Sequence, residues 1–144
     1  MFKRTLDKIV KEVDRSFPVL LITGPRQVGK TTLLEMCAQS NRTYVSLDDL
    51  NIRRLAQEDP ALFFQTYIPP LVIDEVQYAP ELFSQIKIIV DREKKDGLFW
   101  LTGSQNFNLM QGITETLAGR VAIIDLLGLS QGELDNRANK VQPF

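Results

Sequence analysis

The chain has 144 residues and a formal net charge of −1, from 17 basic and 18 acidic side chains. This length suffices for one domain with a real core, and the near-neutral charge gives no electrostatic reason to expect nucleic acid or a membrane surface as a main partner. One cysteine, no histidine and no long apolar stretch exclude an intramolecular disulfide, a Cys/His zinc site, a His-based triad and a membrane-spanning helix.

The first segment is predicted to be an amphipathic helix, because Leu6, Ile9 and Val13 recur at helical spacing between charged side chains. Acidic residues among its lysines argue against a signal or transit peptide, so we expect a cytoplasmic protein. The apolar run at residues 18–23 follows and predicts a short buried strand.

A glycine-rich loop comes directly after this strand and has the sequence Gly24-Pro25-Arg26-Gln27-Val28-Gly29-Lys30-Thr31. It fits the phosphate-binding pattern Gly-x-x-x-x-Gly-Lys-Ser/Thr without a mismatch, and helix formers follow from Thr32 onward. The glycines let backbone N–H groups face an anion, Lys30 supplies a charge to the β- and γ-phosphates, and Thr31 offers its hydroxyl to Mg²⁺. We therefore expect residues 24–32 to bind nucleotide phosphates, with Thr31 as a metal ligand. The alternative is a glycine-rich turn with an incidental lysine.

Strands and helices alternate along the rest of the chain. Apolar or alternating runs predict four further strands at residues 43–47, 71–73, 98–101 and 121–126. Helices are predicted after Asp48-Asp49, after Asp59-Pro60, from Pro80, and over residues 105–119 with an interruption at Gly112. The helix from Pro80 has an apolar face made of Leu82, Phe83, Ile86, Ile89 and Val90. This alternation specifies an α/β fold with a parallel sheet covered on both faces.

Two carboxylates follow the strand at residues 71–73. Neighbouring side chains diverge where a strand ends, so one can serve a metal while the other faces an attacking water. We expect Asp74 to hold Mg²⁺ through water and Glu75 to act as general base or water-positioning residue. The alternative is a solvated turn or a helix cap.

A third set of polar residues ends the strand at residues 98–101. A side chain there can sense the γ-phosphate or orient the water, and Ser104 is the first choice, with Thr102 and Asn106 as rivals. An ordinary strand-to-helix turn with a capping serine explains the same residues equally well.

Two arginines are further candidates. Arg120 lies just before the last strand, where it could reach a neighbouring subunit's nucleotide as an arginine finger, or pair with a nearby acid at a helix end. Arg26 lies within the loop and is either exposed to solvent or a contact to a partner.

These motifs together resemble the AAA+-type P-loop ATPases, and more narrowly a prokaryotic AAA ATPase family. The resemblance rests on five motifs in order, at residues 24–32, 47–49 (Leu-Asp-Asp), 74–80 (Asp-Glu-x-Gln-Tyr-x-Pro), 102–105 (Thr-Gly-Ser-Gln) and 117–120 (Leu-x-Gly-Arg). It implies a three-layer P-loop NTPase fold whose five-stranded parallel sheet has the order 5-1-4-3-2.

The resemblance also implies roles for single residues. Lys30 and Thr31 bind phosphates and Mg²⁺, Asp74 and Glu75 form the second acidic motif, Ser104 lies on the sensor strand, and Arg120 matches the finger arginine. We expect an ATPase core over residues 1–134 and a polar tail over 135–144 that frays into disorder. Family members usually continue into a C-terminal domain that this chain lacks, so weak nucleotide affinity and slow hydrolysis are expected.

The leading hypothesis is an ATPase that uses Mg²⁺, hydrolyses the β–γ bond and passes motion to an unidentified protein partner, in a homo-oligomer with Arg120 acting in trans. The alternative is an ATP-dependent switch or interaction module with little turnover. A GTPase is disfavoured, because Asn139-Lys140-Val141-Gln142 lacks the final aspartate of the guanine motif. A small-molecule kinase would need an acceptor pocket and an arginine-rich lid, and the sequence shows neither.

Overall fold

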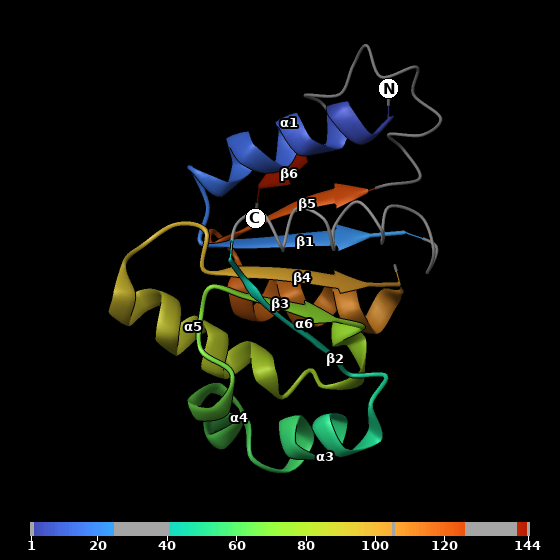
Figure 1. Cartoon of the computed structure of the whole chain (residues 1–144), viewed down its shortest axis with the longest axis vertical. Helices are drawn as coiled ribbons and strands as arrows, with labels where there is room; N and C mark the ends of the chain where they lie inside the picture. Colours follow the sequence, from blue (N-terminus) through green and yellow to red (C-terminus); the bar gives the residue numbers. More distant parts are fainter. Residues whose placement is uncertain (1, 25–40, 105, 126–140, 144) are drawn as a thin grey trace.

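The computed structural model describes residues 2–24, 41–104, 106–125 and 141–143 (Figure 1). In chain order its elements are α1 (Phe2–Asp14), β1 (Val19–Thr23), β2 (Thr43–Ser46), α3 (Leu50–Glu58), α4 (Pro60–Thr66), β3 (Leu71–Asp74), the 3₁₀ turn η1 (Val76–Tyr78), α5 (Leu82–Glu93), β4 (Phe99–Gly103), α6 (Phe107–Leu117), β5 (Val121–Asp125) and β6 (Val141–Pro143). None of the helices in these ranges has the length and apolar character that crossing a membrane requires.

The strands form one sheet in the order β2-β3-β4-β1-β5-β6, and all pairs among the first five are parallel. Read from the other edge, these five strands have the order 5-1-4-3-2, so the predicted α/β architecture is confirmed. Figure 1 shows this order, from β5 above to β2 below. Because the strands are parallel, their carboxyl ends meet at one edge of the sheet, which is where ligands bind in open α/β sheets.

The tail was predicted to fray into disorder, and this was wrong for residues 141–143. They form β6, which pairs antiparallel with β5, with Ile124 opposite Val141 and Ala122 opposite Pro143. The outer side of β5 would otherwise present unpaired backbone groups, and even a short strand satisfies some of them. A three-residue strand has too little pattern to be recognised in the sequence.

The larger part of the core lies on one face of the sheet, under α3, α4, α5 and α6. Its largest fully buried side chains include Phe63 of α4, Phe83 of α5 and Phe99 of β4. The predicted apolar face of α5 is confirmed, because its buried residues are Leu82, Phe83, Ile86, Ile89 and Val90.

The other face carries a smaller cluster beneath α1. Ile9, Val10 and Val13 of this helix are buried against side chains that include Leu20 and Trp100. The predicted amphipathic helix is confirmed, and these three apolar side chains face the sheet.

Aspartates begin both short helices that follow β2. The side chain of Asp49 accepts hydrogen bonds from the backbone N–H groups of Asn51 and Ile52. At the end of α3 the N–H of Asp59 donates to the backbone oxygen of Leu55. The side chain of Asp59 accepts a hydrogen bond from the N–H of Leu62 at the start of α4. Both caps agree with the sequence prediction, because short carboxylates satisfy the unpaired N–H groups of a first helical turn.

The interruption predicted at Gly112 was wrong, since α6 runs without a break from Phe107 to Leu117. A Cβ at position 112 would lie 3.1 Å from Cε2 of Phe83, closer than an ordinary contact. The glycine therefore lets α6 approach α5, and tertiary packing overrides its low helix propensity.

Candidate functional site

Two predicted parts of the site meet at the carboxyl edge of the sheet. Gly24 follows the last residue of β1, and Asp74 is the last residue of β3. β4 lies between them, and because neighbouring strands are about 4.8 Å apart, the two strand ends are about 10 Å apart. Gly24 has a φ of +152°, which L side chains rarely adopt. The chain thus leaves β1 with the backbone freedom that the glycine-rich loop was predicted to need.

The rest of the predicted phosphate loop lies outside the described residues. These loop positions are Pro25, Arg26, Gln27, Val28, Gly29, Lys30, Thr31 and Thr32. Their roles in binding phosphates and Mg²⁺ stay predictions from the sequence.

Asp74 is buried and accepts hydrogen bonds from three hydroxyl groups. Tyr44 Oη and Ser46 Oγ donate to its Oδ2 at 2.8 and 3.1 Å, and Thr102 Oγ1 donates to its Oδ1 at 2.6 Å. The register explains this convergence, because Ser46 pairs with Asp74 across β2 and β3. Tyr44 lies two residues earlier on the same face of β2, and Thr102 lies on the other neighbour, β4.

The three hydroxyls orient the Asp74 carboxylate. Burial, followed by the hydrogen bond to Asp74, raises the pKa of the Tyr44 phenol well above its ordinary value. Tyr44 therefore stays a protonated donor to Asp74 at every physiological pH.

Glu75 follows in a backbone conformation that is uncommon for a residue with a side chain. Its φ is +61° and its ψ is +48°, in the left-handed region. The N–H of Glu75 donates to Thr102 Oγ1 at 3.2 Å, and its Oε1 accepts a hydrogen bond from Gln77 Nε2 at 2.7 Å. With 4% of its surface exposed, Glu75 is a buried acid beside a buried acid. Perturbed backbone geometry of this kind often occurs at functional sites.

A third carboxylate joins the pair from the loop after β2. Asp48, Asp74 and Glu75 each offer an oxygen, and these oxygens all lie within 4.8 Å of one another. Asp48 is exposed, whereas the other two residues are buried. Carboxylate oxygens are the hard ligands that Mg²⁺ prefers, so the chemistry of this set fits a divalent cation that would offset its negative charge.

The strand predicted to carry a sensor residue does run between the loop strand and the Asp74 strand. Of its three candidates, Thr102 contacts both Asp74 and the backbone of Glu75. Asn106 caps α6 by accepting from the N–H of Leu109 at 2.8 Å, which is an ordinary structural role. Ser104 lies between them and is partly buried, and its role as sensor stays a prediction.

Arg120 lies at the opposite, amino edge of the sheet. Its Nε and Nη2 donate to the two carboxylate oxygens of Asp91 at 2.8 and 3.1 Å, and this hydrogen bonding lowers the pKa of the Asp91 carboxyl. The pairing that the sequence offered as an alternative is therefore present. The five residues of β5, at about 3.3 Å each, place Arg120 roughly 16 Å from the carboxyl edge of its own sheet. A finger role is thus open to Arg120 only towards a neighbouring molecule.

Tyr44, Ser46 and Gln77 belong to the site, and the sequence prediction missed all three. The implied strand order places the second strand beside the third. Ser46, the polar residue at the carboxyl end of the second strand, could therefore have been identified as a neighbour of Asp74. Tyr44 follows from the same alternation once the register is known. Gln77 is the glutamine of the Asp-Glu-x-Gln-Tyr-x-Pro motif, but the sequence does not predict its contact with Glu75, because that contact depends on the left-handed turn at Glu75.

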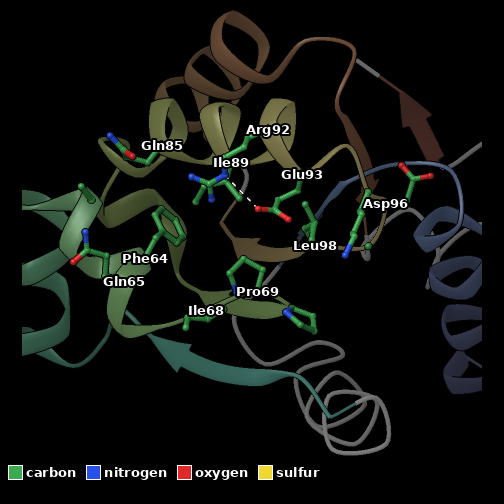
Figure 2. A pocket seen from close by; sticks show the side chains of 14 residues that line it. Phe64, Gln65, Ile68, Pro69, Gln85, Ile89, Arg92, Glu93, Asp96 and Leu98 are labelled. Atoms are coloured by element: carbon green, nitrogen blue, oxygen red, sulfur yellow. Dashed lines mark hydrogen bonds and ion pairs between the residues drawn. The ribbon is translucent and has the colours of Figure 1, made fainter.

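A pocket of about 810 Å³ lies at the amino edge, away from these acids. Phe64, Ile68 and Pro69 line it together with Arg92 and Glu93, whose side chains form an ion pair at 3.2 Å. Figure 2 shows this mixed lining, with apolar side chains near the charged pair. The pocket shares no residue with the acidic site and is separate from it.

Comparison with known proteins gives one matching family and a structural neighbour. A family described as an AAA domain matches residues 16–135. In structure, the chain is similar to a DNA replication initiation factor, with a TM-score of 0.50 and 14% sequence identity over 94% of this chain and 52% of that one. At this identity the likeness concerns the fold alone.

Two relatives are similar in sequence, an uncharacterized protein of Mycobacterium bovis and one of Mycobacterium tuberculosis. Each is 37% identical over 123 residues, which is 84% of this chain and 27% of the relative. The chain therefore spans about a quarter of the length of the curated relatives it matches.

Proposed function

The chain belongs to the AAA domain family, and from this we propose that it works in the cytoplasm as a Mg²⁺-dependent ATPase that hydrolyses the β–γ bond of ATP. The observation that carries the proposal is the buried pair of Asp74 and Glu75 at the carboxyl edge, two strands from Gly24. A phosphate loop on one strand and an acid pair on a strand nearby are the two halves that phosphoryl transfer needs.

In the proposed mechanism the residues divide the work of positioning and proton transfer. Lys30 and the loop backbone hold the β- and γ-phosphates, while Asp74 and the Thr31 hydroxyl hold the cation. Bound Mg²⁺ supplies charge neutralisation on the phosphate oxygens. Glu75 accepts a proton from water, whose oxygen bonds to the γ-phosphorus as the bond to the bridging oxygen of ADP breaks. Ser104 is proposed to sense the γ-phosphate from the neighbouring strand.

Calorimetric titration with ATP, ADP and GTP in the presence of Mg²⁺ tests the nucleotide site. We expect ATP and ADP to bind better than GTP, and Lys30→Ala to weaken ATP binding by at least about tenfold, because a phosphate-binding charge is lost. Lys95→Ala is the matched control, since this exposed lysine lines the pocket at the opposite edge. Equal ATP affinities for the parent chain and Lys30→Ala would contradict the proposed site.

We further propose that the chain assembles with copies of itself and that Arg120 acts in trans. Arg120 lies at the amino edge, too far from the proposed nucleotide site of its own chain to contact it. Its two hydrogen bonds to Asp91 are on the surface, where the guanidinium can leave Asp91 and bind a phosphate instead. We also propose that the energy of hydrolysis is passed to a protein partner. In the relatives, which are longer than this chain, further parts of the same polypeptide are candidates for that partner.

Mixing two inactive variants tests the trans arrangement. Arg120→Ala keeps Glu75, and Glu75→Gln keeps Arg120, so a mixed assembly contains some complete sites. In an equal mixture about a quarter of the sites should be complete, and turnover should reappear at about that level. Arg54→Ala, which removes an exposed arginine of α3, is expected to leave turnover unchanged. A mixture as inactive as its components would show that Arg120 does not act across subunits.

A further inference from the structure

Gln77 is a polar side chain at the acid pair to which the proposed mechanism gives no role. We propose that it is a positioning residue that holds the Glu75 carboxylate in the orientation needed for proton transfer. Its Nε2 donates to Glu75 Oε1 at 2.7 Å, a short hydrogen bond to a charged acceptor. The inference rests on the proposed function and deepens it, since it names what fixes the general base.

The backbone brings the two side chains together. Glu75 and Gln77 are two residues apart. Such neighbours point to different sides of a helix, and in a strand they share a face but lie about 7 Å apart. The left-handed conformation of Glu75, at φ +61°, turns the chain directly from β3 into η1. Tyr78 N–H then donates to Glu75 O at 3.2 Å, which closes the turn around Gln77. A left-handed conformation is unfavourable for a residue with a Cβ, so surrounding contacts must maintain it.

The sensor strand leaves room for this amide. A Cβ at Gly103 would lie 2.8 Å from Gln77 Oε1, so a side chain at position 103 would displace the amide. Gly103 follows Thr102, whose hydroxyl bonds both Asp74 and the N–H of Glu75. The end of β4 thus supports both the backbone of Glu75 and the group that holds its carboxylate.

The orientation of the amide is set by Glu75. Gln77 Oε1 is buried and accepts no hydrogen bond from the residues that the structure describes. Turning the amide over would place this oxygen against the carboxylate and set two acceptors 2.7 Å apart. An unsatisfied acceptor is costly, and it is tolerated here because the donor side of the amide binds a charged group.

The neighbouring helix supports the same turn without touching the acid. Gln57 of α3 donates from Nε2 to the backbone oxygen of Tyr78 at 2.6 Å, and the guanidinium of Arg53 lies 3.8 Å above the ring of Tyr78. Gln57 is therefore a matched control for Gln77. Each is a glutamine that donates one hydrogen bond at η1, but only Gln77 contacts the general base.

The test is steady-state ATP hydrolysis with Gln77→Met, Gln77→Glu and Gln57→Met, with ATP affinity and unfolding midpoints measured in parallel. Met keeps the length of Gln without the donor, and Glu places a second carboxylate beside Glu75. We expect kcat to fall about tenfold in Gln77→Met and further in Gln77→Glu, with ATP affinity within twofold of the parent chain. Gln57→Met should keep the kcat of the parent.

A double variant shows whether Gln77 acts through Glu75. In a Glu75→Gln background the loss caused by Gln77→Met should disappear, because the carboxylate it positions is gone. The inference is overturned if Gln57→Met loses as much kcat as Gln77→Met, if Gln77→Met keeps the parent kcat, or if the two losses multiply in the double variant. The proposed function itself would be rejected if the parent chain has no turnover or if Glu75→Gln hydrolyses ATP at the parent rate. These two results are measured on proteins other than the Gln77 and Gln57 variants, so the two failures can be told apart.

Discussion

Glu75→Gln is expected to bind ATP as the parent chain does and to lose turnover by a factor on the order of 10²–10⁴, the usual contribution of a positioned general base. The amide has the size of the carboxylate but cannot accept a proton from water. Because Glu75 is buried beside Asp74, removing one negative charge should not unfold the protein. Binding is measured by calorimetry, and turnover by release of phosphate.

The matched control for this variant is Glu58→Gln, which changes an exposed glutamate near the end of α3. Its turnover should equal that of the parent chain. If Glu75→Gln hydrolyses ATP at the parent rate, Glu75 is not the base, and Asp48 becomes the next carboxylate to examine because it lies in the same cluster.

Asp14→Ala should lower the free energy of unfolding by about 3 kcal/mol, the largest effect on stability that we expect from a single surface-accessible side chain. Asp14 accepts hydrogen bonds from Arg42 Nη2 at 2.9 and 3.1 Å and from Trp100 Nε1 at 2.9 Å. The side chain of Arg42 is only 5% exposed, and its guanidinium lies 4.0 Å above the Trp100 ring. Without the Asp14 carboxylate, the buried positive charge of Arg42 is less well balanced, and α1 loses its hydrogen bond to Trp100 of β4.

Urea denaturation measures this change, with Glu12→Ala as the control. Glu12 lies two residues earlier on the same helix and is exposed, so its loss should change stability by less than about 0.5 kcal/mol. If Asp14→Ala and Glu12→Ala have the same midpoint, the Asp14 contacts do not hold α1 on the sheet.

Local patterns in the sequence predicted most elements and the residues that begin them. The buried face of α5, the caps at Asp49 and Asp59, and the strand that ends in Asp74 all follow from side-chain spacing and capping chemistry within a few residues. The strand order came from the resemblance, since no local pattern states which strands are neighbours. Local propensity was insufficient at Gly112, where contact with Phe83 decides the outcome.

The sequence by itself determined that this protein alternates strands and helices, carries a phosphate-loop motif after its first strand, and places two acids after a later one. Only the tertiary structure decided which side chains surround those acids. Tyr44, Ser46 and Thr102 come from two other strands and meet at Asp74 through the sheet register. The physical reason is the range of the interactions: periodicity and capping act within one helical turn or strand, whereas register is set by pairing between segments about 30 residues apart.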